Sequence, residues 1–108
     1  MQPATTITEP VLFILLSLAE QPRHGYSILK DVEKMSDGRV RLSTGTLYGA
    51  LRRLLEEDWI QRYEDDNTSR GRQGYRLTSH GRRVLRQEVA RMKQLTRLAT
   101  LRFARREV

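Results

Sequence analysis

The segment from Ser43 to Arg53 collects side chains that suit contacts with a phosphate chain and with base edges. Hydroxyl groups can donate to phosphate oxygens, glycine lets another backbone come close, and arginine forks fit phosphate and guanine. The candidates in this segment are Ser43, Thr44, Gly45, Thr46, Tyr48, Gly49, Arg52 and Arg53. Further along, Arg70 and Arg72 flank a glycine in a polar, turn-rich stretch, which suits a minor groove but is also common in solvated loops. These residue types indicate a nucleic-acid interface.

Gly49 has two interpretations. It falls on the polar face of a predicted helix, where packing does not require glycine, and glycine costs a helix about 1 kcal/mol relative to alanine. Close approach of a phosphate chain would account for it, and so would a neutral surface position. The neighbouring Tyr48 lies at the edge of the apolar face, so it suits the core, a phosphate contact, or both.

Nothing in the sequence indicates catalysis or metal binding. There is no cysteine, and the two histidines, His24 and His80, are far apart in the chain. This excludes disulfides and thiolate metal sites and disfavours a histidine site. Phosphate-binding loops, nucleophile elbows, zinc-protease motifs and dinucleotide fingerprints are absent. We predict no catalytic residues, no metal ligands and no cofactor, and therefore a protein that is not an enzyme.

The positive charge is concentrated near the C-terminal end. The 108 residues carry 20 Lys and Arg against 13 Asp and Glu, a net charge of +7. Residues 78–108 hold nine basic and two acidic residues, which accounts for the whole excess. The excess favours an anionic partner, either nucleic acid or a membrane surface. It does not by itself support the candidates upstream.

Apolar periodicity, caps and turn residues predict four helices and a β-hairpin. We expect helices at residues 9–20, 24–35 and 43–57, and from Thr78 to Arg102 or beyond. Thr6 or Thr8 can cap the first of these helices, Ser43 the third and Thr78 the last. We expect hairpin strands at 59–64 and 75–77, and a further short strand at 39–42. A helix pair with a short connection, followed by a hairpin, is the winged helix-turn-helix layout. The predicted fold is mainly α (α+β), with a two- to three-stranded β wing and a long C-terminal dimerisation helix.

In the second helix, Tyr26, Leu29, Val32 and Met35 recur every three residues, so we expect them to line the core.

Two helices carry more apolar surface than a small domain covers easily. The first is apolar almost all round, which fits burial against a partner chain or, equally, inside one protomer. The last has an apolar seam of about three and a half heptads, for which we favour a homodimer. A helix folded onto its own core and a basic helix lying on a membrane are the alternatives. The predicted interface residues are Val11, Ile14, Leu15, Leu85, Val89, Met92, Leu95, Ala99 and Phe103.

Three motifs carry a family resemblance. They are Pro22-Arg23-His24-Gly25-Tyr26, Thr44-Gly45-Thr46-Leu47-Tyr48 with Leu51 and Leu54, and Arg70 to Gly74 followed by Tyr75-Arg76-Leu77-Thr78 and Gly81. In this combination, over about residues 9 to 103, the chain resembles the PadR family of bacterial transcriptional regulators, in particular the short subfamily with one C-terminal dimerisation helix. The resemblance implies a winged-helix homodimer that binds palindromic operator DNA, mostly as a repressor, and that a small molecule releases in several members.

The resemblance also assigns roles. It places Thr44, Thr46 and Tyr48 at the start of the recognition helix and Arg70 and Arg72 in the basic wing. The motif at residues 24–26 begins the second helix and is interpreted as mainly structural.

Two positions depart from the family pattern. Asp58 stands where a glycine is usual before the wing, and aspartate tolerates the left-handed conformation better than most residues. The last helix lacks the tryptophan that drug-binding short members place there, because the one tryptophan, Trp59, begins the wing.

The resulting expectation is a sequence-specific DNA-binding regulator that acts as a homodimer on double-stranded operator DNA. A winged-helix module for nucleic acid or protein without operator specificity is the alternative. A small aromatic or hydrophobic effector is an expected partner, and its binding residues are unknown. We expect residues 1–8 to be an N-terminal extension, 9–78 the DNA-binding domain and 79–108 the dimerisation helix, all within one compact domain. The longest apolar run, residues 11–16, is far shorter than the ~20 residues that span a bilayer, so no membrane partner and a cytoplasmic location are expected.

Overall fold

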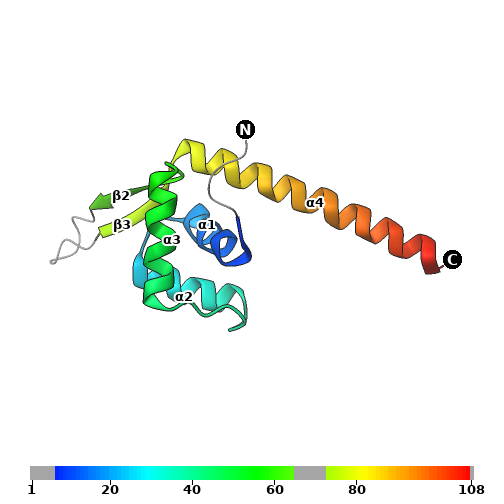
Figure 1. Cartoon of the computed structure of the whole chain (residues 1–108), viewed down its shortest axis with the longest axis horizontal. Helices are drawn as coiled ribbons and strands as arrows, with labels where there is room; N and C mark the ends of the chain where they lie inside the picture. Colours follow the sequence, from blue (N-terminus) through cyan, green and yellow to red (C-terminus); the bar gives the residue numbers. More distant parts are fainter. Residues whose placement is uncertain (1–6, 65–72, 108) are drawn as a thin grey trace.

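Four helices and a small antiparallel sheet make up the chain, as the sequence predicts (Figure 1). The computed structural model describes residues 7–64 and 73–107. In chain order the elements are α1 (Glu9–Glu20), β1 (Arg23–His24), α2 (Gly25–Met35), α3 (Thr44–Glu56), β2 (Ile60–Glu64), β3 (Gln73–Leu77) and α4 (Ser79–Glu107). The sheet has the order β1-β3-β2, with β2 and β3 forming the wing. This arrangement is a winged helix-turn-helix with a long C-terminal helix.

Side-chain caps start three of the helices where the sequence predicts them. Thr8 Oγ1 accepts a hydrogen bond from the Val11 amide at the start of α1, at 3.4 Å. Ser43 Oγ accepts from the Thr46 amide at 3.1 Å, and Thr78 Oγ1 accepts from the Gly81 amide at 2.9 Å. Each bond satisfies a backbone donor that the first helical turn would otherwise leave unpaired.

The short strand predicted at residues 39–42 is wrong, and the third strand is β1. The backbone after α2 is instead held in a turn, where the Val40 amide donates to Ser36 Oγ at 2.9 Å and the Arg39 amide donates to the Ser36 carbonyl at 3.0 Å. In β1, Arg23 pairs with Tyr75 and His24 pairs with Gly74. A strand of two residues has no alternation that a sequence pattern could reveal.

Arg23 anchors β1 between the first two helices. Its side chain is only 12% exposed and forms ion pairs with Glu20 and Asp31, both at 3.5 Å. Its Nε donates to the Ser17 carbonyl at 3.1 Å, and one terminal nitrogen donates to Ser27 Oγ at 3.3 Å. One side chain thus joins the end of α1 to the start of α2, which fixes the angle at which α2 leaves the sheet.

Tyr26 does not line the core, contrary to its spacing. Its side chain is 67% exposed, whereas Ile28 and Val32 are fully buried and Met35 is 38% exposed. Residues three apart on a helix drift by about 60° at each step, so Tyr26 lies about 120° from Val32 around the helix. The buried face of α2 contains Ile28 and Val32 and Tyr26 falls outside it, whereas Met35 is the last residue of the helix.

The first helix packs inside its own protomer. Val11 is 7% exposed, Ile14 1% and Leu15 0%, and all three belong to the hydrophobic core. This corrects their assignment to the dimer interface, because a side chain with almost no exposed surface offers nothing to a partner. Leu12, Phe13, Leu16 and Ala19 of the same helix are only partly buried against that core.

The end of α3 is shaped by Asp58, which adopts the left-handed conformation with φ 61°. The Asp58 amide donates to the Leu55 carbonyl at 3.1 Å and the Trp59 amide donates to the Leu54 carbonyl at 3.0 Å. These are the two bonds of a Schellman motif, which ends a helix and turns the chain sharply. The conformation expected for the aspartate at this position is confirmed.

The same corner holds the start of α4. Thr78 Oγ1 donates to the Asp58 carbonyl at 2.6 Å, and the Thr78 amide donates to the Trp59 carbonyl at 3.0 Å. Gly81 packs so closely on the Trp59 backbone that a β-carbon would overlap it. The Trp59 side chain is 1% exposed. We call residues 58, 59, 78 and 81 the α3–α4 corner.

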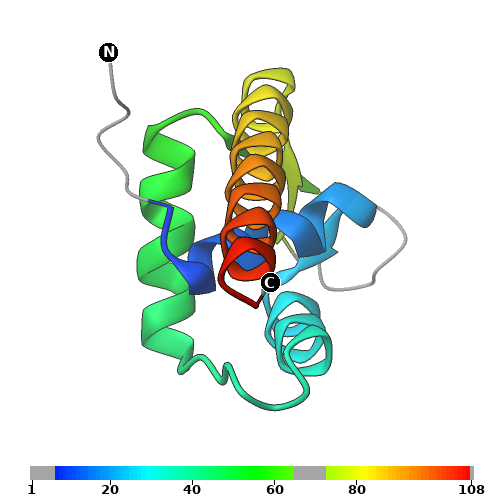
Figure 2. The same ribbon diagram turned by 90° about the vertical axis from the view of Figure 1, so that its right-hand side faces the viewer.

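Helix α4 leaves the rest of the fold after its first three turns. Leu85 is buried and Val89 is partly buried, but every residue described from 90 to 106 is exposed. The molecule therefore measures 62 × 33 × 23 Å. Figure 2 looks back along α4 from its free end toward the other elements. Within the described ranges, no helix has both the length and the hydrophobicity needed to cross a membrane.

The left-handed aspartate leads to a stability prediction. Asp58→Gly should raise the free energy of unfolding by about 0.5–1 kcal/mol, because glycine adopts positive φ without a β-carbon clash. Asp58→Ala should lower it by about 1 kcal/mol for the opposite reason. Urea unfolding followed by circular dichroism at one protein concentration measures both changes.

Asp58→Asn is the matched control, since it keeps a side chain that tolerates this conformation and removes only a carboxylate from a helix C-terminus. An Asp58→Gly protein no more stable than Asp58→Asn would show that charge, and not backbone conformation, limits stability at this position.

Candidate nucleic-acid interface

The N-terminal turn of α3 presents hydroxyl groups to solvent. Ser43 and Thr46 are exposed, and Ser43 Oγ donates to Thr46 Oγ1 at 2.9 Å in addition to capping the helix. Thr44 and Gly45 between them are also exposed. The turn therefore combines hydroxyl donors with the free amides of a helix N-terminus, an arrangement that suits a phosphate group.

The exposed face of α3 continues for three turns. Leu47, Ala50, Leu51 and Leu54 are buried on the other side of the helix. The predicted residues on the exposed side are Ser43, Thr44, Gly45, Thr46, Tyr48, Gly49, Arg52 and Arg53, and all of them are exposed. Neither arginine forms an ion pair with a residue that the structure describes. The exposed face of α3 therefore carries two guanidinium groups that have no ion-pair partner among the described residues.

Gly45 and Gly49 border open space. A β-carbon built on either residue meets no atom within 4 Å, apart from the helix's own neighbouring backbone. No packing contact within the protomer therefore requires either glycine, although each weakens the helix by about 1 kcal/mol relative to alanine.

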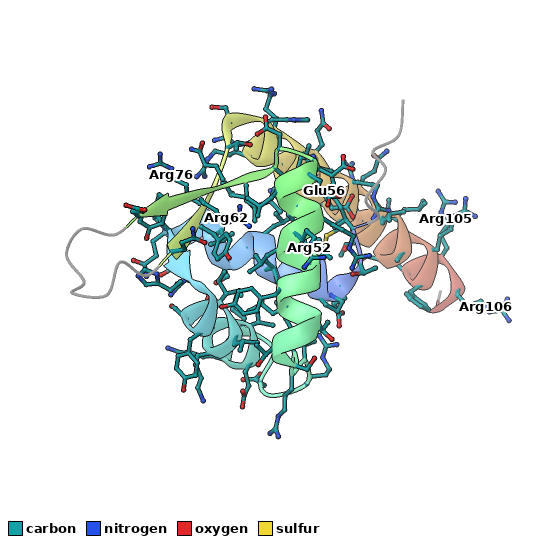
Figure 3. All side chains as sticks on the ribbon, turned by 60° about the vertical axis from the view of Figure 1, so that its left-hand side comes forward. Arg52, Glu56, Arg62, Arg76, Arg105 and Arg106 are labelled. Carbon is teal, nitrogen blue, oxygen red and sulfur yellow. The ribbon has the colours of Figure 1, made fainter. Side chains whose placement is uncertain are left out.

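The wing adds two arginines that the sequence analysis did not single out. In the β2–β3 register, Arg62 pairs with Tyr75 and Gln61 pairs with Arg76. Because paired residues point to the same side of a sheet, Arg62 and Arg76 project from opposite faces of the wing. Figure 3 shows Arg62 on the side toward α3, in the region of Arg52, and Arg76 on the side away from it. Only the register of the two strands, which the sequence does not give, shows that the two arginines point to opposite sides of the wing.

The outer face of the wing is braced by aromatic and cationic stacking. The Tyr63 ring lies over Gly74, where a β-carbon would strike it. The His24 ring stacks on Tyr63 with centroids 6.4 Å apart, and the Arg76 guanidinium lies 5.7 Å from the Tyr63 ring. His24 Nδ1 also lies 3.1 Å from the Gln73 carbonyl oxygen. This confirms a structural role for His24, which ties the wing to the start of α2.

The predicted wing contacts, Arg70 and Arg72, lie outside the described residues. Glu64 and Gln73, the last described residues on either side of them, are paired across the wing. The role of the two arginines stays a prediction.

Where α2, α3 and β3 meet there is a cleft of about 530 Å³. It is lined by His24, Gly25, Tyr26, Tyr48, Gln73 and Tyr75. Tyr75 is buried, whereas Tyr26 and Tyr48 are 67% and 45% exposed. The spacing of Tyr26 predicts a core position for it, so the sequence gives no sign of this cleft.

The free part of α4 displays a broad apolar surface. Met92, Leu95 and Phe103 are 39%, 50% and 69% exposed, and Ala99 between them is exposed as well. Leu98 and Leu101, which were not among the predicted interface residues, are each 50% exposed. Of the remaining predicted positions on this helix, Val89 is partly buried and Leu85, at 5%, belongs to the protomer's own core.

Charge on α4 is almost entirely unpaired. Among the described side chains of this helix, the one ion pair joins Glu88 and Arg91, with hydrogen bonds of 3.0 and 2.6 Å. The hydrogen bond from Arg91 lowers the pKa of the Glu88 carboxyl. The other cations of α4 face solvent.

Known proteins share both the sequence pattern and the fold. Residues 14–87 match the transcriptional regulator PadR-like family. An uncharacterized 37.1 kDa protein in transposon TN4556 of Streptomyces fradiae is 37% identical over 85 residues. That match covers 79% of this chain but 23% of the relative, so the chain spans less than a quarter of that protein's length.

Two solved structures show the likeness in three dimensions. A PadR family transcription regulator from Clostridium difficile R20291 is 24% identical, with a TM-score of 0.73 over 87% of this chain and 97% of that one. Bacillus subtilis PadR in complex with operator DNA is 22% identical, with a TM-score of 0.63 over 72% of this chain and 45% of that one. At these identities the likeness concerns the fold. Together with the sequence match over residues 14–87, it means that the chain belongs to the PadR-like family of transcriptional regulators.

Proposed function

We propose that the protein is a sequence-specific DNA-binding repressor that acts as a homodimer on a palindromic operator. The observation that carries this proposal is the exposed face of α3, where hydroxyls and glycines face solvent and neither arginine forms an ion pair with a described residue. A face of this composition, on the second helix of a helix-turn-helix, suits the major groove. The family membership and the operator complex of the Bacillus subtilis relative support the same function.

In this proposal each protomer contacts DNA through α3 and through the wing. Residues Ser43 to Arg53 enter the major groove, with the hydroxyl-rich first turn of α3 against a phosphate. Arg62 contacts the backbone beside the groove from the inner side of the wing, and Arg70 and Arg72 contact the flanking backbone or minor groove. Binding at a promoter then blocks the polymerase.

The glycines of α3 fit this docking. Without side chains at Gly45 and Gly49, the DNA backbone can come within van der Waals distance of the α3 backbone. The stability that each glycine costs the helix is then offset by contacts made only in the complex.

A homodimer would cover the exposed apolar surface of α4. The revised interface consists of Val89, Met92, Leu95, Ala99 and Phe103, together with Leu98 and Leu101. A groove of about 380 Å³ between α1 and α4, lined in part by Leu16, Ala19 and Val89, offers a partner helix a place to dock. Pairing of this kind would set the two recognition helices about 34–36 Å apart, one turn of DNA.

Release from DNA would follow if a small molecule changed the angle between protomers. A small aromatic or hydrophobic effector that prefers the released state would weaken operator binding through a coupling energy of about 1–3 kcal/mol.

The functional proposal is tested by fluorescence anisotropy on duplex DNA from the protein's own promoter, with a scrambled duplex of equal length as control. We expect a preference of about 10³ or more for the promoter that survives physiological salt. Equal affinity for the two duplexes, fading with salt, would instead favour a nucleic-acid module without operator specificity.

Gly49→Ala separates the two interpretations of that glycine. The free energy of unfolding should rise by about 1 kcal/mol, because alanine is the better helix former and nothing in the protomer blocks its β-carbon. Operator affinity should fall, because the new methyl group keeps the DNA backbone at a distance. Thermal unfolding and anisotropy on the same sample measure both quantities, and unchanged affinity would make Gly49 a neutral surface residue.

Leu95→Asp should convert the dimer to monomers at micromolar concentration, because it places an unpaired charge in an apolar seam. Light scattering coupled to size-exclusion chromatography gives the mass. Ala104→Asp adds the same charge to the same helix away from the seam and should leave the dimer intact. A Leu95→Asp protein that remains dimeric would locate the seam elsewhere.

A further inference from the structure

Two exposed tyrosines on neighbouring helices form one surface. Tyr26 of α2 is 67% exposed and Tyr48 of α3 is 45% exposed, and both line the cleft of about 530 Å³ at the base of the wing. Large aromatic side chains that gather at an open cleft usually mark a site of interaction.

Both rings are held in place by neighbours. The Tyr48 ring packs on Gly25 so closely that a β-carbon there would overlap its hydroxyl end. The Lys30 ammonium lies 5.5 Å from the centroid of the Tyr26 ring, within the range of a cation–π contact. Little side-chain freedom is therefore lost when a ligand binds between them.

Among the described residues, the two tyrosine hydroxyls and the Lys30 ammonium have no hydrogen-bonded or ion-paired partner. The surface therefore offers two hydroxyl donors and one ammonium group, with no carboxylate paired to it. These are donors that suit a phosphodiester oxygen.

The surface also adjoins the proposed DNA-binding face, because Tyr48 belongs to both. We propose that Tyr26, Lys30 and Tyr48 clamp the sugar–phosphate backbone beside the base pairs that α3 reaches. This inference rests on the proposed function. The tyrosine hydroxyls and the ammonium group of Lys30 bind phosphate oxygens, and the ring faces pack against deoxyribose. This is a backbone contact, so it strengthens binding to every sequence equally.

The test uses the full chain and the promoter and scrambled duplexes, titrated across salt by anisotropy. Lys30→Gln should reduce the slope of log affinity against log salt by about 1, because one phosphate contact is lost. Tyr26→Phe removes only the hydroxyl and should weaken binding roughly tenfold on both duplexes. Lys34→Gln is the matched control, since it removes the same charge one turn further along α2, and it should keep the wild-type slope.

The outcomes distinguish this inference from the proposed function. If wild-type protein binds the promoter but Lys30→Gln keeps its slope and Tyr26→Phe keeps its affinity, the clamp is overturned while the proposed function stands, and the cleft is left to a small ligand. If Lys34→Gln lowers the slope as much as Lys30→Gln, the effect is general charge and the clamp is again overturned. If wild-type protein binds neither duplex, the proposed function and the clamp fail together.

Discussion

The α3–α4 corner is the constraint on which the rest of the structure depends. Within two residues the chain must end α3, start the wing and receive the cap of α4. The left-handed Asp58 makes the turn, the Trp59 side chain is buried, and the Trp59 carbonyl accepts from the Thr78 amide. Gly81 is needed because no β-carbon fits against the Trp59 backbone. Helix α3, the wing and the long helix α4 are thus oriented from one point.

A second set of contacts orients α2 against the wing. Arg23 ties the end of α1 to the start of α2 through one buried guanidinium, and His24 braces the outer face of the wing through Tyr63. These contacts and the α3–α4 corner hold α3 from its buried side, so its exposed side is not needed to keep the helix in place. Its exposed face is free to carry glycines and unpaired arginines that would be poor choices for stability alone.

Caps, turns and apolar periodicity predicted where most helices and strands lie. They did not predict which strands pair or which apolar side chains are buried, because these depend on contacts between distant residues. Caps and turns are properties of a few adjacent residues, so Thr8, Ser43 and Thr78 could be identified as helix starts from the sequence. The strand β1 could not, because two residues show no period and their pairing partner lies about fifty positions away. The prediction for Tyr26 was wrong because residues at a three-residue spacing drift around a helix. The prediction for Val11, Ile14 and Leu15 was wrong because a helix that is apolar all round has the same sequence pattern whether its own core or a partner chain covers it. On α3 every predicted residue is exposed, whereas Arg62 required the strand register.

The length of α4 has a mechanical consequence. A helix of 29 residues is about 43 Å long, so a rotation of about 5° at its base moves its far end by about 4 Å. Its base is fixed to the end of α3 through Thr78 and Gly81, and residues 90–106 are all exposed in the described part of the chain. The free end of α4 is therefore far from the point where the helix is held, and that point lies at the end of α3. Because the helix is uninterrupted over its 29 residues, the position of its free end is set by the direction in which its base leaves α3.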